Sequence, residues 1–489
     1  MLIDLSLAAG GFTGIAQDTR LIFSMLAHDA DISVGGLMYP TGRYPMPNLH
    51  AKVANDSRVA TVLRAVSAGS IGEPSGSLPR RIYGRFRQLA AAATANHSAA
   101  NVPTWLKTDM IWRTAFQKTL PAQQRARILE SEFLVADLTI QQLVDRTLFL
   151  PLLREKQLLP GNWDAVLLPM PRPLRVPAHI HKVVRYHDAI PMTHSDTVGH
   201  PLDIAFHHGF TNSCAKDSLF VCNSPMSVDD LDNVAPGAGE NAIVIPCAIQ
   251  SVAPPKYRTP VHDIIAQRMS FRALNIENSS SAGVSLRRSI DRSLRQESKI
   301  RFIISVSSLE PRKNFNSAIA AWERLRIATG KDIKFVLVGN DGWNMDSILE
   351  FMRPHVLNGN LLHIQKVPFQ ELQVLYEAAE LCLFPSYAEG FGYAPLEALQ
   401  MRTPVVVSDS PVFRWSLEDA ALFADPYSPS EITECAIRLL DEPENHERRL
   451  DLVENGARVL KRFSTLAVAD KWHDFFTGQM QAMGGKMKK

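Results

Sequence analysis

The sequence has few cysteines and no long hydrophobic run. Its five cysteines among 489 residues form no Cys-x-x-Cys pair, which excludes a small disulfide scaffold and predicts buried thiols in a reducing compartment. No stretch of about 18 uncharged apolar residues occurs, so no membrane-spanning helix is predicted. The N-terminal segment MLIDLSLAAGGF carries Asp4 and no early Lys or Arg, unlike a secretory signal peptide. We therefore expect a cytoplasmic protein, with the option of contact at the inner face of the cytoplasmic membrane.

The chain also lacks an excess of charge of either sign. Its 52 Lys and Arg residues balance 50 Asp and Glu residues, for a net charge of +2, and this balance argues against a dedicated nucleic-acid binder. A composition of 46% hydrophobic and 21% charged residues excludes a disordered chain and a coiled coil. The length corresponds to about two or three globular domains.

Short apolar runs alternate with helical segments in the second half of the chain. The predicted strands lie at 302–307, 335–339, 361–367, 381–386, 404–409 and 421–425. Apolar strands without polar alternation are buried on both faces, and strands separated by helices pair in parallel. This half is therefore predicted to be a doubly wound α/β domain.

The first half shows the same alternation less regularly, and residues 30–150 give no clear order. Its predicted strands lie at 2–7, 164–169, 182–188, 218–224 and 242–247. The predicted organisation is an N-terminal domain at 1–270, a linker or surface excursion at 271–300, a second domain at 301–465, and a C-terminal helix and tail at 466–489 that could pack back on the first domain. Because ligands of parallel sheets bind beyond the carboxyl ends of the strands, we expect functional residues directly after strands.

The segment FPSYAEGFGYAPLEAL, residues 384–399, follows a predicted strand and combines two glutamates with two glycines. The glycines allow backbone N–H groups to approach a ligand, and the start of the following helix suits phosphate. Glu389 and Glu397 can accept hydrogen bonds from hydroxyls. Two such acceptors beside an anion site predict a nucleotide-sugar site, and the alternative is a surface turn before an ordinary helix.

Two more segments follow predicted strands. SSLEPRKNF, residues 307–315, carries Arg312 and Lys313, which can neutralise a diphosphate; the alternative is a pair of solvated cations. VVRYHDAIP, residues 183–191, ends a strand of the first domain at His187 and Asp188. A histidine with a purely structural role is the alternative there.

The family that these segments resemble is glycosyltransferase family 4, the retaining nucleotide-sugar transferases of the two-domain GT-B fold. The resemblance is closest to bacterial mannosyltransferases of surface-polysaccharide and lipopolysaccharide assembly. It rests on EGFGYAPLE, SLEPRKN, YHDAIP, FVCNSPMSVDDL and DPYSPSEI, with a looser match at GGFTGIAQDTR. It implies two doubly wound Rossmann-like domains that face each other across a cleft, the first on the acceptor side and the second binding the nucleotide sugar.

The resemblance also implies roles for single residues. The catalytic set would be His187 near the anomeric carbon, Arg312 and Lys313 at the leaving diphosphate, and Glu389 at the sugar hydroxyls. The donor-binding residues would be Gly11, Gly14, Phe391, Gly392, Tyr393 and Glu397, with Glu397 on the ribose. Many relatives carry an arginine several residues before the lysine, where this sequence has Ser307 and Ser308. The diphosphate charge would then fall on Arg312 and Lys313.

The sequence shows no Asp-x-Asp pair or Asp/His cluster after a strand that would suit a divalent metal, so no metal and no cofactor besides the donor, favoured as GDP-mannose, is expected. Cations and helix dipoles can stabilise the leaving group instead. The family would then transfer with retention by front-face attack, the departing phosphate taking the proton of a saccharide or lipid-linked glycan acceptor. The alternatives are a sugar-nucleotide epimerase of the same fold and a catalytically inactive carbohydrate-binding subunit.

A basic segment in the first half suggests a surface for a membrane. LPRRIYGRFRQL, residues 78–89, contains Arg80, Arg81, Arg85 and Arg87, no acid, and interleaved aromatic residues. Such a pattern suits an anionic headgroup surface, although RNA would fit it equally well and a solvated helix face is the ordinary explanation. The segment thus offers the option of a peripheral contact with an anionic membrane, and no binding of nucleic acid is expected.

Overall fold

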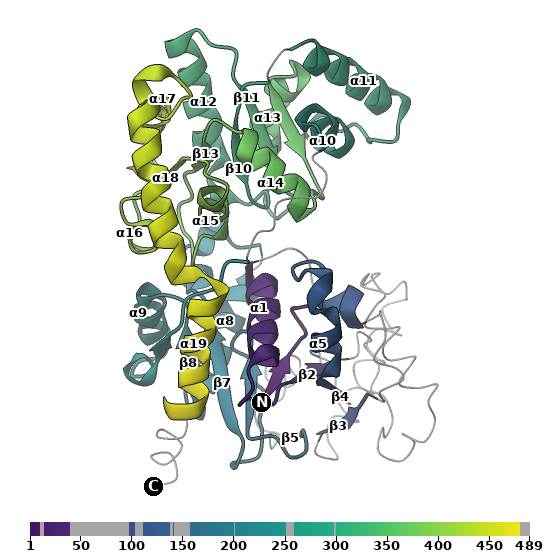
Figure 1. The fold of residues 1–489 in the computed structure, drawn as a ribbon, viewed down its shortest axis with the longest axis vertical. Coiled ribbons are helices and arrows are strands. Elements are labelled where there is room, and N and C mark those ends of the chain that lie inside the picture. Colours follow the sequence, from purple (N-terminus) through teal and green to yellow (C-terminus); the bar gives the residue numbers. More distant parts are fainter. Residues whose placement is uncertain are drawn as a thin grey trace. The chain divides into compact units, whose positions relative to one another are not determined.

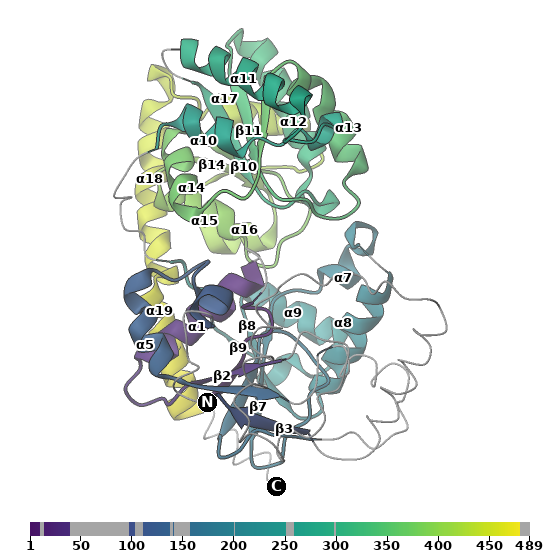
Figure 2. The ribbon, with the colours of Figure 1, turned by 90° about the vertical axis from the view of Figure 1, so that its right-hand side faces the viewer.

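The computed structural model describes residues 1–9, 14–39, 97–102, 111–136, 140, 157–199, 201–250, 259–297 and 300–479. The chain divides into two compact units. Unit 1 comprises Met1–His187, Phe206–Gln250 and Thr465–Lys489, and unit 2 comprises Asp188–Ala205 and Ser251–Ser464. Each unit is built around one sheet with helices on both faces (Figures 1 and 2). The predicted pair of doubly wound Rossmann-like domains is confirmed, whereas their facing across a cleft stays a prediction.

The sheet of unit 1 has nine strands among the described residues, in the order β5-β3-β4-β2-β1-β6-β7-β8-β9. Its strands are β1 (Leu2–Asp4), β2 (Gly35–Met38), β3 (His97–Asn101), β4 (Glu132–Ala136), β5 (Leu158–Leu159), β6 (Ala165–Leu168), β7 (His181–Tyr186), β8 (Ser218–Cys222) and β9 (Ile243–Val244). The pairs are parallel except for β3 with β4. The helices are α1 (Gly14–His28), α5 (Arg125–Glu130), α9 (Pro225–Val234) and α19 (Thr465–Asp474), and α8 (Pro201–Cys214) runs from unit 2 into unit 1.

Helix α19 packs against α1 in unit 1, although it follows unit 2 in the sequence. Its buried Trp472, together with Phe475 beyond its end, belongs to the same hydrophobic core as Phe23 of α1 and Phe133 of β4. Burial of large aromatic side chains is the main source of the stability of such a contact. Helix α19 and Phe475 are therefore part of the core of unit 1.

The sheet of unit 2 has six parallel strands in the described part of the chain, in the order β12-β11-β10-β13-β14-β15. Its strands are β10 (Phe302–Val306), β11 (Lys334–Val338), β12 (Leu361–Ile364), β13 (Cys382–Phe384), β14 (Val405–Ser408) and β15 (Leu422–Ala424). Its helices are α7 (Ile190–Thr193), α10 (Val261–Arg268), α11 (Ser281–Gln296), α12 (Phe315–Thr329), α13 (Asp346–Leu357), α14 (Phe369–Ala378), α15 (Tyr393–Gln400), α16 (Pro411–Leu417), α17 (Pro429–Ile437) and α18 (His446–Leu460). The strand order reverses between β10 and β13, and ligands of such sheets bind at that point.

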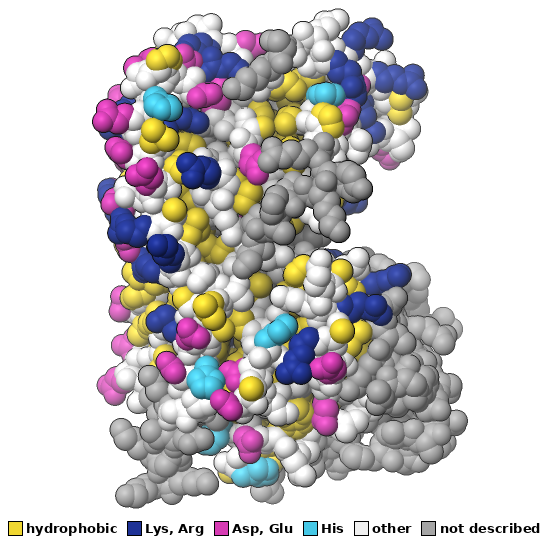
Figure 3. All heavy atoms as spheres, in the orientation of Figure 1, with side chains coloured by type: hydrophobic (Ala, Val, Ile, Leu, Met, Phe, Trp, Pro, Cys, Tyr) yellow, Lys and Arg dark blue, Asp and Glu magenta, His cyan; other side chains and the backbone are white. Residues whose placement is uncertain are grey.

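Residues 271–300, expected to be a linker or surface excursion, belong to unit 2. Residues 281–296 form helix α11, which packs on α10 within unit 2. The side chain of Ser280 caps the helix by accepting a hydrogen bond from the backbone of Gly283, and Ile290 and Leu294 are buried. The serines and arginines that suggested a linker lie largely on the exposed face, and Figure 3 shows basic side chains gathered over this helix. Unit 2 accordingly resumes at Ser251 and not after residue 270.

The structure also contains strands that the sequence pattern did not predict between residues 30 and 150. Strand β2 begins with Gly35 and Gly36, and glycine normally disfavours a strand. A Cβ atom at Gly35 would come within 2.5 Å of Trp163, and one at Gly36 within 2.5 Å of Leu5. The two glycines are therefore explained by the close approach of these side chains.

The predictions about cysteines and membrane spans can be compared with the described residues. All five cysteines are described, and they are buried and form no disulfide, as the spacing predicted. None of the helices in the described ranges is both long enough and apolar enough to cross a bilayer. Residues 78–89, with the four arginines of the basic segment, lie outside the described residues, as does Gly11.

Candidate functional site

The two sequence segments of unit 2 that were predicted to bind a nucleotide sugar meet at the carboxyl ends of neighbouring strands. Strand β10 pairs with β13 through Ile304 and Cys382. The first segment leaves β10 and forms the short 3-10 turn η7 (Pro311–Lys313), and the second leaves β13 as the loop that precedes α15. The two loops therefore start side by side at the reversal point of the sheet.

Backbone and side-chain hydrogen bonds fix the two loops to each other. The backbone N–H of Tyr387 donates to the carbonyl of Arg312 at 2.8 Å, and the side-chain amide of Asn314 donates to the carbonyl of Pro385 at 2.9 Å. Asn314 adopts a left-handed conformation with φ of 56°, which asparagine tolerates better than most residues. Asn314 also precedes α12, so the same residue ends η7, starts the helix and anchors the second loop.

Glu389 lies between the two cations of the first loop. The Nζ of Lys313 is 2.6 Å from one carboxylate oxygen of Glu389, and Nη1 of Arg312 is 3.2 Å from the other. The side chains of Glu389 and Lys313 are 7% and 9% exposed. Burial alone would raise the pKa of Glu389, but Lys313 and Arg312 beside it bring that pKa below its usual value. The carboxylate is therefore ionised, and the predicted convergence of Arg312, Lys313 and Glu389 is observed.

A further acid belongs to this cluster and was not predicted. Glu310 is 6% exposed, and its carboxylate accepts a hydrogen bond from Nε of Arg312 at 2.9 Å. Burial raises the pKa of Glu310, although Arg312 lies beside it. Its position within the SLEPRKN segment was the available signal. Arg312 is thus held by two carboxylates and by the carbonyl of Ala388 at 3.2 Å.

The ammonium group of Lys313 also lies over the ring of Phe384, 5.3 Å from its centroid. An aromatic face attracts a cation electrostatically. The cation therefore has a defined position even before any ligand binds, and electrostatic stabilisation is strongest when the donors are held in place in advance.

Gly392 ends the second loop in a left-handed conformation with φ of 83°, directly before α15. A Cβ atom there would lie 2.4 Å from the ring of Phe413. Phe391, which precedes it, is buried and packs edge-on against Tyr393, Trp415 and Phe463 with centroid distances of 5.2, 6.4 and 5.4 Å. The aromatic cluster thus anchors the loop whose backbone was predicted to approach the donor.

We expect Gly392→Ala to destabilise the protein by about 1–3 kcal/mol, because alanine is strained at this φ and would contact Phe413. The control is Gly330→Ala, since Gly330 has a φ of 67° and a Cβ added there would have no atom within 4 Å. Urea denaturation followed by tryptophan fluorescence measures both. An equal decrease in the free energy of unfolding of the two variants would show that the contact with Phe413 does not destabilise the protein.

Glu397 lies on α15 and is 8% exposed. It lies close enough to the hydroxyl of Tyr376 and the thiol of Cys382 to add to the effect of burial, which raises the pKa of both groups. Its predicted contact with a ribose stays a prediction. Among the remaining predicted residues, Gly14 begins α1 and His187 follows β7, both in unit 1.

A known protein family matches a stretch of the chain that lies within unit 2. Residues 287–459 match the family described as "Glycosyl transferases group 1". The serotype-specific mannosyltransferase WbdA of Escherichia coli is 38% identical over 130 residues, which cover 26% of this chain and 16% of WbdA. The O-antigen chain mannosyltransferase RfbU of Salmonella typhimurium is 30% identical over 133 residues, which cover 27% of this chain and 36% of RfbU. The matched regions span less than half of these relatives.

A solved structure extends the similarity of fold to almost the whole chain. The α,α-trehalose 6-phosphate synthase of Burkholderia multivorans aligns over 99% of both chains with a TM-score of 0.51 and 12% identity. An identity this low supports the fold and nothing further. The fold class is GT-B, the predicted resemblance to bacterial surface-polysaccharide mannosyltransferases is confirmed, and residues 287–459 match the glycosyl transferases group 1 family.

Proposed function

We propose that this protein is a retaining, metal-independent glycosyltransferase that moves mannose from GDP-mannose to a saccharide or lipid-linked glycan acceptor in bacterial surface-polysaccharide synthesis. The observation that carries the proposal is the contact of Glu389 with both Lys313 and Arg312 at the reversal point of the sheet. Mannosyltransferases among the relatives support mannose as the sugar.

The charges of the cluster support a site in which a diphosphate replaces a carboxylate as the partner of the cations. Lys313 and Arg312 are balanced by Glu389 and Glu310 in the structure. A nucleotide diphosphate would bind Lys313 and Arg312 in place of the carboxylates, because phosphate oxygens accept strong charge-assisted hydrogen bonds from lysine and arginine. Glu389 would then accept hydrogen bonds from the hydroxyls of the sugar that the diphosphate carries.

The leaving diphosphate gains charge as the bond to the anomeric carbon breaks. Lys313 and Arg312 would stabilise that charge, and the N-terminus of α15 would add a partial positive charge. The oxygen of the diphosphate would accept the proton of the attacking hydroxyl, so the acceptor oxygen bonds to the anomeric carbon on the face that the diphosphate leaves. His187 would lie near that carbon.

A donor screen tests the proposed function. Thermal unfolding in the presence of GDP-mannose, UDP-glucose and ADP-glucose should show the largest rise in melting temperature with GDP-mannose, because a ligand that binds the native state stabilises it. Incubation with GDP-mannose should then release GDP, with free mannose in the absence of an acceptor. Epimerised nucleotide sugar would identify an epimerase, and binding without turnover would identify a carbohydrate-binding subunit.

We also propose that the basic segment at residues 78–89 contacts an anionic membrane, where a lipid-linked acceptor would lie. Its arginines alternate with aromatic residues in the sequence, a pattern that suits anionic headgroups. Sedimentation with vesicles that contain phosphatidylglycerol tests this, and no binding at low salt would end the idea.

A further inference from the structure

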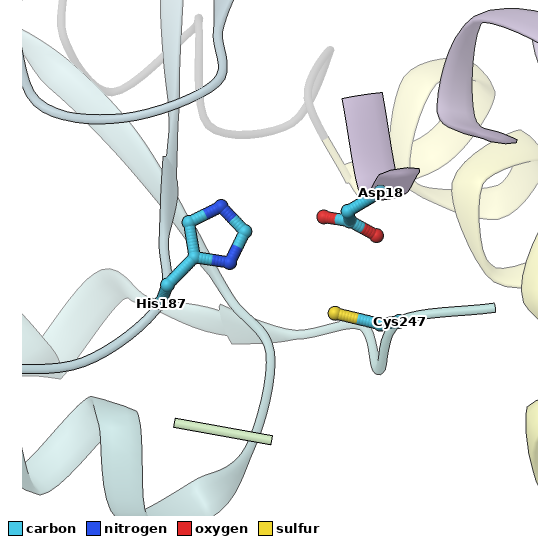
Figure 4. A group of neighbouring side chains, drawn as sticks. All are labelled: Asp18, His187 and Cys247. Carbon is cyan, nitrogen blue, oxygen red and sulfur yellow. The ribbon is translucent and has the colours of Figure 1, made fainter. Parts of the chain in front are cut away.

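Three potential metal ligands gather in unit 1. They are Asp18 of α1, His187 after β7 and Cys247 after β9, and one ligand atom from each lies within 4.8 Å of the other two. Figure 4 shows the carboxylate, the imidazole and the thiol turned toward one another. Asp18 and Cys247 are each 1% exposed, and His187 is half-buried.

The tautomer of His187 suits a metal. Its Nε2 lies 3.0 Å from the carbonyl oxygen of Pro169. Because a carbonyl only accepts hydrogen bonds, Nε2 carries a proton, and in the neutral imidazole the lone pair is then on Nδ1. Histidine ligands in metal sites are commonly oriented in this way, with one ring nitrogen held by a carbonyl and the other bound to the metal.

Arg185 holds the two other ligands from one side. Its Nε is 2.8 Å from Oδ2 of Asp18, and its Nη2 is 3.4 Å from Sγ of Cys247. The carbonyl oxygens of Cys222 and Ile245 accept hydrogen bonds from its Nη1 at 3.3 and 2.5 Å. The guanidinium therefore fixes the positions of the carboxylate and of the cysteine sulfur.

The second oxygen of Asp18 has no such support. Oδ1 is buried, and it has no hydrogen-bond partner within the described part of the chain. A buried carboxylate oxygen without a donor is costly, and such atoms are rare in native proteins. A bound cation would satisfy this oxygen.

We propose that Asp18, His187 and Cys247 form a binding site for a divalent transition metal of the Zn²⁺ type. Thiolate, imidazole and carboxylate together select Zn²⁺ or Co²⁺ over Mg²⁺, which prefers oxygen ligands alone. Binding releases the thiol proton of Cys247 to solvent. Asp18 and the thiolate then carry two negative charges against the one positive charge of Arg185. The site therefore attracts a dication.

This inference does not depend on the proposed transferase activity. Its ligands belong to unit 1, whereas Lys313, Arg312 and Glu389 belong to unit 2. The metal has no assigned place in sugar transfer, which is proposed to proceed without one. His187 alone is shared with the residues proposed to act in sugar transfer.

Cobalt spectroscopy of the reduced, metal-free protein tests the site. Titration with Co²⁺ should give a thiolate-to-cobalt absorption band in the near ultraviolet that saturates at one equivalent, and Zn²⁺ should abolish the band by displacing Co²⁺. The surface group of Asp29, Asp31 and His473 contains no thiol, so it cannot produce this band.

Matched variants complete the test. Cys247→Ser should remove the band, and Cys435→Ser, which alters a buried thiol of unit 2, should leave it unchanged. Asp18→Asn keeps the thiol and should weaken Co²⁺ binding at least about tenfold. This variant tests the site if Cys247→Ser fails to fold. The proposal would be overturned if the wild-type protein gave no saturable band. It would also be overturned if Cys247→Ser and Asp18→Asn both gave the band and bound Co²⁺ as tightly as the wild type.

Discussion

Replacement of Lys313 by alanine should lower kcat/KM for the proposed mannose transfer by about a hundredfold or more and leave the fold intact. Removal of one preorganised electrostatic donor from an active site has effects of this size. The fold should survive because Arg312 still pairs with Glu389, so the buried carboxylate keeps a cationic partner. GDP release from GDP-mannose measures the effect.

Two further variants make this prediction specific. Lys313→Met keeps an unbranched apolar side chain of similar length and removes the charge that lies over Phe384, so it should lose as much activity as the alanine variant. Lys331→Ala removes another lysine that pairs with a glutamate, Glu442, but precedes β11 at the amino end of the sheet. It should retain wild-type activity. Activity near the wild-type level in Lys313→Met would reject the assigned role.

Replacement of Glu389 by glutamine should lower kcat by about a hundredfold without weakening the binding of GDP. Glu389 occupies Lys313 and Arg312 in the structure, so its charge competes with a diphosphate for the same cations. The neutral amide frees them and also holds the sugar hydroxyls less well. We therefore expect kcat to fall while the affinity for GDP stays the same or rises.

A double-mutant cycle decides whether Glu389 and Lys313 act as a unit. Residues in direct contact are generally not additive, and groups that act together in catalysis are strongly non-additive. The double variant Glu389→Gln, Lys313→Met should then be little slower than Lys313→Met alone. Fully additive losses, together with weaker GDP binding in Glu389→Gln, would show that the two side chains serve separate functions.

The sequence predicted the fold best where local pattern and tertiary environment agree. The strands of unit 2 are short apolar runs rich in β-branched residues, as β14 with its Val405, Val406 and Val407 illustrates. Strand β2 could not be predicted in this way, because Gly35 and Gly36 are required by the side chains of Trp163 and Leu5, which are distant in sequence. Helix α11 was missed although Ser280 is a recognisable N-cap before a pattern of buried Ile290 and Leu294.

The candidate site was predicted in its residues but not in its contacts. Arg312, Lys313 and Glu389 each follow an apolar run, which suggested the carboxyl edge of a sheet. That β10 and β13 are neighbours follows from the strand order, which no local pattern contains. The same is true of Arg185, Asp18 and Cys247, since three segments far apart in the sequence bring them together.

Calorimetric titration with GDP tests most directly whether Lys313 binds the diphosphate of a nucleotide sugar. We predict that the wild-type protein and Lys331→Ala bind GDP equally, and that Lys313→Met binds it at least about tenfold more weakly, since a charge-assisted hydrogen bond contributes about 1.5–3 kcal/mol. Equal affinity of Lys313→Met and the wild type for GDP would contradict the account.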